Sequence, residues 1–287
     1  MLQLSEEYVL ERLPRRAPES NKGRYGRVLC LAGCDRFRGA AQLCVQGALR
    51  GGAGIMTLAS TEKVVAAAAA SLPEAVFLPC RESRDGGIAS YELPLLLAAA
   101  QEASALVVGC GMGNTHDTAV LARALMEQCR APMVLDADGL NALAGQFPRR
   151  EAPLIITPHP GEMARLTGLS VPEVEADRAG VAGHFASEHG CTVVLKGHRT
   201  LIAAPDGSLY QNTTGNAGMA RGGSGDLLAG LMAALLAQGL SPIDAACCGV
   251  WLHGTAGDLC AARLSQQAVL PHDMLYDLCL YLAGKGL

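Results

Sequence analysis

The sequence predicts an α/β fold of three layers, in which helices cover both faces of a mostly parallel central sheet. Three observations support this prediction. Short apolar runs recur along the 287-residue chain, and most are followed by a segment of helical length. Most of these runs are apolar at every position, as expected of parallel strands that are buried on both faces. Half of the residues are hydrophobic and only 17% are charged, so a large core can form.

Eight apolar runs are expected to form strands. They are Arg27–Ala32, Ile55–Ala59, Ala75–Leu78, Ala105–Val108, Met133–Asp136, Leu154–Thr157, Thr192–Lys196 and Thr200–Ala204. Helical patterns lie between them, at Ala40–Arg50, Thr61–Ser71, Thr115–Arg130 and Pro172–His189. The segment Pro205-Asp206-Gly207-Ser208 predicts a hairpin turn before Leu209-Tyr210, and therefore an antiparallel edge. After Tyr210 the pattern changes to a glycine-rich loop and then to helix through Leu282.

Composition narrows the class of protein. We expect one domain over residues 1–287, with residues 1–19 as a leading helix or arm, because no linker or repeat interrupts the pattern. The net charge is −4 and no basic run occurs, which argues against a nucleic-acid partner. No apolar stretch reaches the ~18 residues of a membrane span, and the acidic N-terminus does not look like a signal peptide. The eleven cysteines form no Cys-x-x-Cys pair, so we expect buried thiols in a reducing cytoplasm and no disulfide or zinc framework.

The most specific motif runs from Gly215 to Asp226 and leads into a helical pattern at Leu227–Ala237. Glycines at the start of a helix let the backbone approach an anion, and the free N–H groups and the dipole of the first turn favour phosphate. Asp226 could then take a proton from a hydroxyl that attacks this phosphate. The alternative is that Ser224 or Asp226 merely caps the helix, but four glycines within eight residues exceed what a cap needs.

A second motif, Thr157-Pro158-His159-Pro160-Gly161-Glu162, lies where a strand ends and a helix begins. Pro160 suits the first helical turn, and the helix dipole favours the carboxylate of Glu162 there. Two prolines hold His159 rigidly at the carboxyl end of a strand, where open α/β sheets bind their ligands. We therefore expect His159 to have a function beyond packing at the turn.

Three further clusters follow strands and leave alternatives open. Asp136 and Asp138 suit magnesium or a substrate hydroxyl, and they suit a capped turn equally well. The turn Lys196–Thr200 could hold phosphate, although lysines in hairpins are usually just solvated. Gly109–Gly113 contains half of a dinucleotide-binding fingerprint but lacks its acidic residue, so we expect only a close approach to some ligand.

Together, Thr157–Glu162 and Gly218–Asp226 resemble the paired motifs of the ADP/ATP-dependent NAD(P)H-hydrate dehydratases. Other segments follow that family's order, namely Lys22-Gly23-x-x-Gly26, Asp136–Asn141, Lys196-Gly197-x-x-Thr200 and Leu252-His253-Gly254. The resemblance covers roughly residues 20 to 285. The chain departs from the family where Gly33-Cys34-Asp35 replaces Gly-Gly-Ser, Arg221 replaces a common Thr and Cys110 replaces a usual Pro.

The resemblance implies a ribokinase-like fold and a carbon–oxygen lyase that repairs hydrated NADH and NADPH. In this family, ADP or ATP phosphorylates the ring hydroxyl of the S epimer, and phosphate is then eliminated. Asp226 corresponds to the catalytic base, and Glu162 to an acidic residue that helps order Mg²⁺. The implied contacts with the hydrate are Ala40, Gly111, Gly113, His159 and Asp226. The implied contacts with the nucleotide are Lys196, Gly197, His198, Arg199, Thr200, Gly223, Ser224 and Gly225.

The resemblance also suggests the partners. Many relatives carry a fused N-terminal epimerase domain, and only Met1–Glu19 precede the matching region here, so we expect a separate NAD(P)H-hydrate epimerase. We further expect a homo-oligomer that uses ADP in preference to ATP. The alternative function is a ribokinase-like kinase of a small vitamin precursor or sugar, although His159 stands where such kinases typically have asparagine. A nucleotide-binding module without catalysis would not need Asp226, and a dehydrogenase would need the complete fingerprint.

Overall fold

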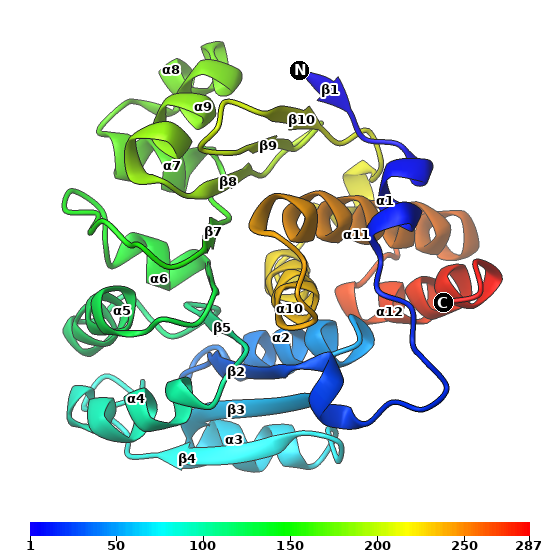
Figure 1. Ribbon diagram of the computed structural model, residues 1–287. Helices are drawn as coiled ribbons and strands as arrows, with labels where there is room; N and C mark the ends of the chain where they lie inside the picture. Colours follow the sequence, from blue (N-terminus) through cyan, green and yellow to red (C-terminus); the bar gives the residue numbers. More distant parts are fainter.

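The computed structural model describes residues 1–287 and contains a ten-stranded sheet with helices on both faces (Figure 1). The strand order is β1-β10-β9-β8-β7-β6-β5-β2-β3-β4. Pairing is parallel from β4 through β8 and antiparallel between β8, β9 and β10, while β1 joins β10 in parallel. The strands are β1 Leu2–Gln3, β2 Arg27–Leu31, β3 Ile55–Thr61, β4 Val76–Cys80, β5 Ala105–Val108, β6 Met133–Leu135, β7 Leu154–Ile156, β8 Thr192–Leu195, β9 Leu201–Ala203 and β10 Leu209–Gln211.

The helices divide into two layers, one on each face of the sheet. Those on the first face are α1 Glu6–Arg12, α2 Arg38–Arg50, α3 Glu62–Ala69, α10 Ser224–Ala237, α11 Pro242–Leu264 and α12 Pro271–Gly284. Those on the second face are α4 Leu93–Gln101, α5 His116–Gln128, α6 Ala137–Asn141, α7 Pro160–Thr167, α8 Val171–Ala176 and α9 Arg178–His189. Short 3₁₀ helices lie at Lys22–Tyr25, Ser90–Glu92 and Ala217–Met219.

Burial on both faces explains why the strands are apolar at every position. Alternate side chains of a strand point to opposite faces of the sheet. In β2, Val28 and Cys30 belong to the core under the first layer, whereas Leu29 and Leu31 belong to the core under the second. The predicted three-layer α/β fold with a mostly parallel sheet is therefore confirmed, including the antiparallel hairpin at 205–208.

Two elements differ from the prediction. The segment Pro172–His189, expected as one helix, is divided into α8 and α9 at Asp177. The backbone of Asp177 leaves the helical region (φ −141°, ψ 62°), and its Oδ1 accepts the N–H of Gly180 at 2.9 Å, which caps the start of α9. Strand β1 was not predicted, because its two residues form an edge strand whose place depends on pairing with β10.

Helix α10 is the element that brings the layers and the site together. All residues from Leu227 to Ala237 are buried, and the helix packs against α2 and α11 (Figure 1). A helix that is apolar on every side belongs in a core. Its first turn lies beside the carboxyl ends of β6 and β8, since Gly225 lies close to the ends of the Asp136 and Lys196 side chains. Sheet and helix thus meet where the motifs converge.

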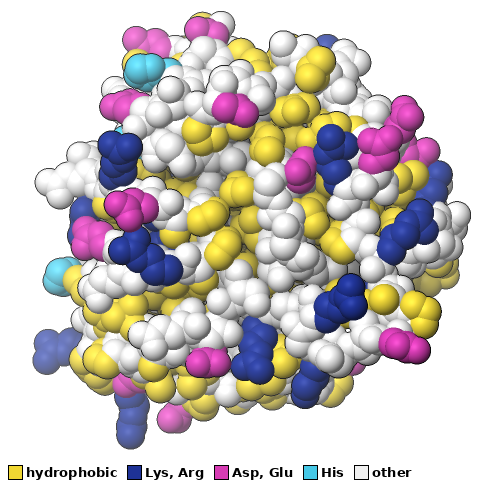
Figure 2. Space-filling model, viewed as in Figure 1, with side chains coloured by type: hydrophobic (Ala, Val, Ile, Leu, Met, Phe, Trp, Pro, Cys, Tyr) yellow, Lys and Arg dark blue, Asp and Glu magenta, His cyan; other side chains and the backbone are white.

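The surface and the cysteines agree with the analysis of composition. Charged side chains of both signs are scattered over the face seen in Figure 2, without a basic patch. No helix combines the length and the apolar character that crossing a membrane requires. All eleven cysteines are free, and ten of them are buried, as expected of small core residues.

Candidate active site

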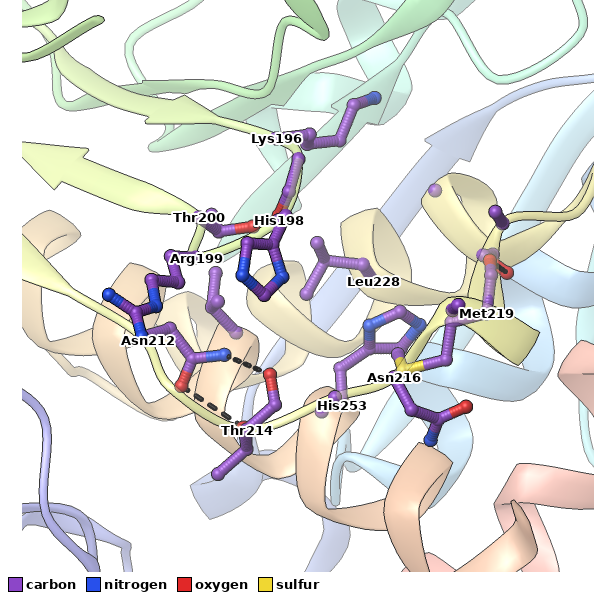
Figure 3. Close-up of a pocket in the computed structure, with 18 of the residues that line it drawn as sticks. Lys196, His198, Arg199, Thr200, Asn212, Thr214, Asn216, Met219, Leu228 and His253 are labelled. Atoms are coloured by element: carbon purple, nitrogen blue, oxygen red, sulfur yellow. Dashed lines mark hydrogen bonds between the residues drawn. The ribbon is translucent and has the colours of Figure 1, made fainter. Parts of the chain in front are cut away.

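A cavity of about 840 Å³ opens beside the first turn of α10 (Figure 3). Three segments form most of its wall: the turn 196–200 between β8 and β9, the loop 212–221 after β10, and residues 250–254 of α11. Ser224, Gly225 and Leu228 contribute the surface of α10. The cavity therefore joins two of the motifs found in the sequence, the turn Lys196–Thr200 and the glycine-rich loop before Asp226.

The start of α10 presents backbone amides to this cavity. Gly223 precedes the helix with φ +97°, and a Cβ at this position would lie 2.4 Å from Cδ1 of Leu43, so only glycine fits. No side chain caps the helix, because the N-cap residue is Gly223, and the hydroxyl of Ser224 donates to the carbonyl of Met219 at 2.8 Å. The amides of Gly225 and Asp226 have no acceptor within the protein. The alternative that Ser224 or Asp226 serves as a cap is excluded, and the free amides could hold an anion.

Asp226 lies between the amides and the carboxyl end of β6. Its carboxylate, the thiol of Cys110 and the carboxylate of Asp136 lie within 4.8 Å of one another. Burial raises the pKa of Asp226 to about 6, and the negative charge of Asp136 acts in the same direction. A carboxylate with this pKa is ionised at neutral pH and accepts a proton more readily than an ordinary aspartate.

Lys196 forms a buried ion pair behind this carboxylate. Its Nζ lies 2.7 Å from Oδ1 of Asp136 and 3.8 Å from Oε2 of Glu162. Burial alone would lower the pKa of Lys196, but the two carboxylates outweigh burial and raise it, so the ammonium is charged. Thr157 donates a second hydrogen bond to Oδ1 of Asp136, at 2.6 Å. The ammonium of Lys196 is therefore paired with protein carboxylates, and it lies next to Gly225 in the first turn of α10.

The two aspartates after β6 have different neighbours. Asp136 faces Lys196, whereas Oδ2 of Asp138 accepts the N–H of Gly113 at 2.8 Å. Asp138 thus holds the loop after β5 in place. Each of the two carboxylates thus has a partner of its own within the protein.

His159 combines a structural role with access to the cavity. Its Nδ1 accepts the N–H groups of Gly161 and Glu162 at 3.0 and 3.3 Å, while Oε2 of Glu162 accepts the N–H of His159 at 2.8 Å. This is a reciprocal capping box at the start of α7. Because Nδ1 is an acceptor, the proton of the neutral imidazole lies on Nε2 and can be donated to a ligand. The side chain is 51% exposed and lines the cavity with Pro160.

The other predicted hydrate contacts form a second group. A Cβ added to Gly111 would lie 2.7 Å from Cβ of Ala40, so the loop after β5 packs directly on the start of α2. Gly113 belongs to the same loop and is held by Asp138. None of Ala40, Gly111 and Gly113 lines the 840 Å³ cavity. The structure thus separates them from His159, and Asp226 lies near their loop through its neighbour Cys110.

Several residues at the cavity had no role in the sequence analysis. Asn212 is buried and holds its loop through hydrogen bonds with Thr214, at 3.0 Å for both the amide donor and the amide acceptor (Figure 3). His253 is buried against α10, and burial lowers the pKa of its imidazole to about 4, so it is neutral. The pattern Leu252-His253-Gly254 marked this position in the sequence. For Asn212 no comparable signal exists, since its side chain acts only through the fold of the loop.

These features resemble those of α/β enzymes that transfer phosphoryl groups, in which an anion site at a helix start lies beside a carboxylate that can act as a base. A solved ribokinase-like protein from Enterococcus faecalis shares the fold, with a TM-score of 0.86 and 27% identity, over 99% of this chain and 96% of that one. Within this class, the chain belongs to the NAD(P)H-hydrate dehydratase family, whose model matches residues 28–278. The resemblance seen in the sequence is confirmed.

Individual relatives agree with this assignment. The chain is 36% identical to the ADP-dependent (S)-NAD(P)H-hydrate dehydratase of Bacillus subtilis, over 94% of both proteins. A crystal structure of the ADP/ATP-dependent enzyme from Bacillus subtilis with ATP and Mg²⁺ has a TM-score of 0.87 at 34% identity, covering 99% of this chain and 98% of that one. The bifunctional NAD(P)H-hydrate repair enzyme of Moorella thermoacetica is 40% identical over 95% of this chain. The chain spans about half the length of such bifunctional relatives, 52% in this case.

Proposed function

We propose that this protein is a nucleotide-dependent dehydratase that converts the S epimer of hydrated NADH or NADPH back to NAD(P)H. The observation that carries the proposal is the carboxylate of Asp226 next to backbone amides that have no acceptor in the protein. Membership of the family supports the identity of the substrate. The reaction is a metabolite repair, and its two substrates are the hydrated cofactor and the nucleotide.

The geometry fits two chemical steps. Asp226 takes the proton of the ring hydroxyl while the hydroxyl oxygen attacks the terminal phosphorus of ADP or ATP, and the bond from that phosphorus to the remaining nucleotide breaks. The amides of the first turn of α10 stabilise the charge on the transferring phosphoryl group. The phosphate then leaves the ring carbon with its bonding electrons, and loss of a proton from the neighbouring carbon restores the double bond. Phosphorylation matters because hydroxide is a poor leaving group.

Magnesium has a suitable residue in Glu162. Oε2 of this carboxylate accepts the N–H of His159, whereas Oε1 accepts no hydrogen bond. Nε2 of His159 lies 3.5 Å from Oε1. Mg²⁺ is usually held by one or two carboxylates together with phosphate oxygens and water. When bound, the ion would neutralise charge on the nucleotide phosphates, and Glu162 would hold it, directly or through water.

The nucleotide would occupy the cavity of about 840 Å³, between the turn 197–200 and the amides of Gly223–Gly225. Lys196 would contact the nucleotide only at the edge of this cavity, since its ammonium is paired with Asp136. The hydrate would approach from the side of Ala40, Gly111 and Gly113 and would extend to His159, with Asp226 between the two ligands. Since the substrate is the S epimer, we expect functional pairing with an NAD(P)H-hydrate epimerase.

The test is to incubate the protein with hydrated NADPH, Mg²⁺ and either ADP or ATP, and to follow the absorbance of NADPH and the release of inorganic phosphate. Asp226→Asn is the control, because an amide keeps the size of the side chain but cannot accept a proton. We expect kcat to fall by about 10²–10⁴-fold while ADP affinity stays within about threefold. Near-normal turnover would refute the role of Asp226. A phosphorylated product without phosphate release would favour the kinase of a small metabolite.

A further inference from the structure

Arg178, the first residue of α9, is bound to the turn between β8 and β9. Its Nη1 donates to the carbonyl of His198 at 2.8 Å. Its Nη2 donates to the carbonyls of Leu195 and Lys196, at 3.0 and 3.3 Å. One guanidinium thus holds three backbone carbonyls within four consecutive residues, a task that suits the planar, forked donors of arginine.

Little else competes for this guanidinium. The nearest carboxylate oxygen, Oε2 of Glu175, lies 3.9 Å from Nε and belongs to a half-exposed side chain. Nε itself is buried and has no hydrogen-bond partner. Asp177, the preceding residue, is engaged in capping α9 through the N–H of Gly180. The hydrogen bonds of Arg178 therefore all go to the turn.

The turn is shaped to receive the guanidinium. Gly197 has φ +147°, and a Cβ there would lie 2.9 Å from Nη2 of Arg178. A side chain at position 197 would push the guanidinium away from the carbonyls. On the other side of the same turn, His198 points into the cavity (Figure 3). Arg178 thus binds the turn from behind, while the cavity lies in front of it.

We propose that Arg178 is a positioning residue for the donor nucleotide, which fixes the turn 195–198 so that residues 197–200 form a rigid wall of the nucleotide cavity. This inference rests on the proposed use of a nucleotide. A wall fixed before binding costs less ordering entropy when the ligand arrives. Arg178 also donates to the backbone carbonyl of Lys196, and Nζ of Lys196 donates to Oδ1 of Asp136 at 2.7 Å. The residue acts through the turn and touches no reacting atom.

The experiment compares Arg178→Gln and Arg178→Lys with a matched control, Arg123→Gln. Arg123, on α5 of the same layer, also donates to a loop carbonyl, that of Gln146 at 3.0 Å, but Gln146, unlike His198, does not line the cavity. ADP with Mg²⁺ and hydrated NADPH are titrated separately by calorimetry. Amide hydrogen exchange of residues 195–200 is measured on each ligand-free protein.

We expect Arg178→Gln to weaken ADP binding by about tenfold, with the affinity for hydrated NADPH changed less than about twofold. Arg178→Lys should recover only part of the loss, because an ammonium cannot bridge three carbonyls. Exchange of the turn should be faster in Arg178→Gln and unchanged in Arg123→Gln.

Three results would overturn the inference: unchanged exchange of the turn in Arg178→Gln, unchanged ADP affinity, or an equal loss of affinity for both ligands. Full recovery of ADP affinity in Arg178→Lys would also overturn it, because the positive charge alone, without the three hydrogen bonds, would then explain the effect. Failure of the unaltered protein to bind either ADP or ATP would refute the proposed function instead, and the exchange measurement would still decide whether Arg178 fixes the turn.

Discussion

The carboxylate of Asp226 is under opposing influences that set both its reactivity and its cost to stability. Burial and the charge of Asp136 raise its pKa to about 6, while the thiol of Cys110 and the ammonium of Lys196 act in the opposite direction. The sequence placed this aspartate beside an anion site, but it could not give the pKa. That value depends on Cys110, Asp136 and Lys196, which reach Asp226 only when β5 to β8 are aligned in one sheet.

The raised pKa predicts a pH-dependent penalty to stability. The pKa of Asp226 in the folded state lies above its value of about 3.9 in the unfolded state. Between these two pH values the folded protein keeps the proton on Asp226 and the unfolded protein has lost it. The free energy of unfolding therefore decreases as the pH rises from about 4 to above 6. Asn at position 226 has no such dependence. We expect the stability of Asp226→Asn, relative to the unaltered protein, to increase by about 1–3 kcal/mol between pH 4 and pH 8.

Chemical denaturation of both proteins at several pH values measures this difference. A constant difference across the range would show that Asp226 has an ordinary pKa. It would also remove the physical reason for its activity as a base near neutral pH.

His159 serves two roles that different substitutions can separate. His159→Ala removes the cap of α7 and should cost about 0.5–2 kcal/mol of stability, besides weakening hydrate binding. His159→Asn can still accept the first-turn N–H groups through Oδ1 but places no N–H where Nε2 lies. We expect this variant to keep the melting temperature while hydrate affinity falls about tenfold and ADP affinity stays unchanged. If the asparagine variant binds both ligands normally, His159 is only a cap.

At the scale of elements, the strands were easier to predict than the helix boundaries. A parallel strand buried on both faces leaves a continuous apolar run, so β5 and β6 were located to within a residue. The break between α8 and α9 depends on one backbone conformation, at Asp177, within an otherwise helical pattern. That break also determines where Arg178 begins its helix, so its clamp on the turn could not be inferred from sequence.

Two neighbouring glycines, Gly222 and Gly223, directly precede α10 and differ in how far their backbone and surroundings tolerate a side chain. Gly223 has φ +97° and lies against Leu43, whereas a Cβ at Gly222 would meet no atom within 4 Å. We expect Gly223→Ala to lower stability by about 1–3 kcal/mol and to weaken ADP binding by about tenfold, because the amides of the turn are displaced. Gly222→Ala is the matched control and should change both quantities little. Melting curves and ADP titration measure the effects, and equal behaviour of the two variants would refute the special role of Gly223.

At the scale of the whole molecule, the proposed sites of the two ligands lie on either side of one carboxylate, that of Asp226. The cavity beside α10 is bounded by His159, Pro160 and segments from β8 to α11, and the loops near Ala40 and Gly111 come from the first half of the chain. The sequence analysis named residues on both sides, since each follows the carboxyl end of a strand. It did not foresee that Lys196 would be committed to Asp136, because that pairing joins residues sixty positions apart.

This arrangement leads to a prediction about the donor nucleotide. Lys196, whose ammonium lies beside Gly225 in the first turn of α10, is paired with Asp136 and Glu162, so its charge is already balanced and is not free to neutralise a third phosphate. Relatives named as ADP-dependent point in the same direction. We therefore expect kcat/KM for ADP to exceed that for ATP by about tenfold or more, with Mg²⁺ present and hydrated NADPH saturating.

Initial rates over a range of each nucleotide provide the measurement, and the non-hydrolysable analogues of both serve as binding controls. Equal kcat/KM values would contradict the preference but not the dehydratase function, whereas a preference for ATP would mean that another cation, such as Arg199 or Arg221 on the cavity wall, supplies the missing charge.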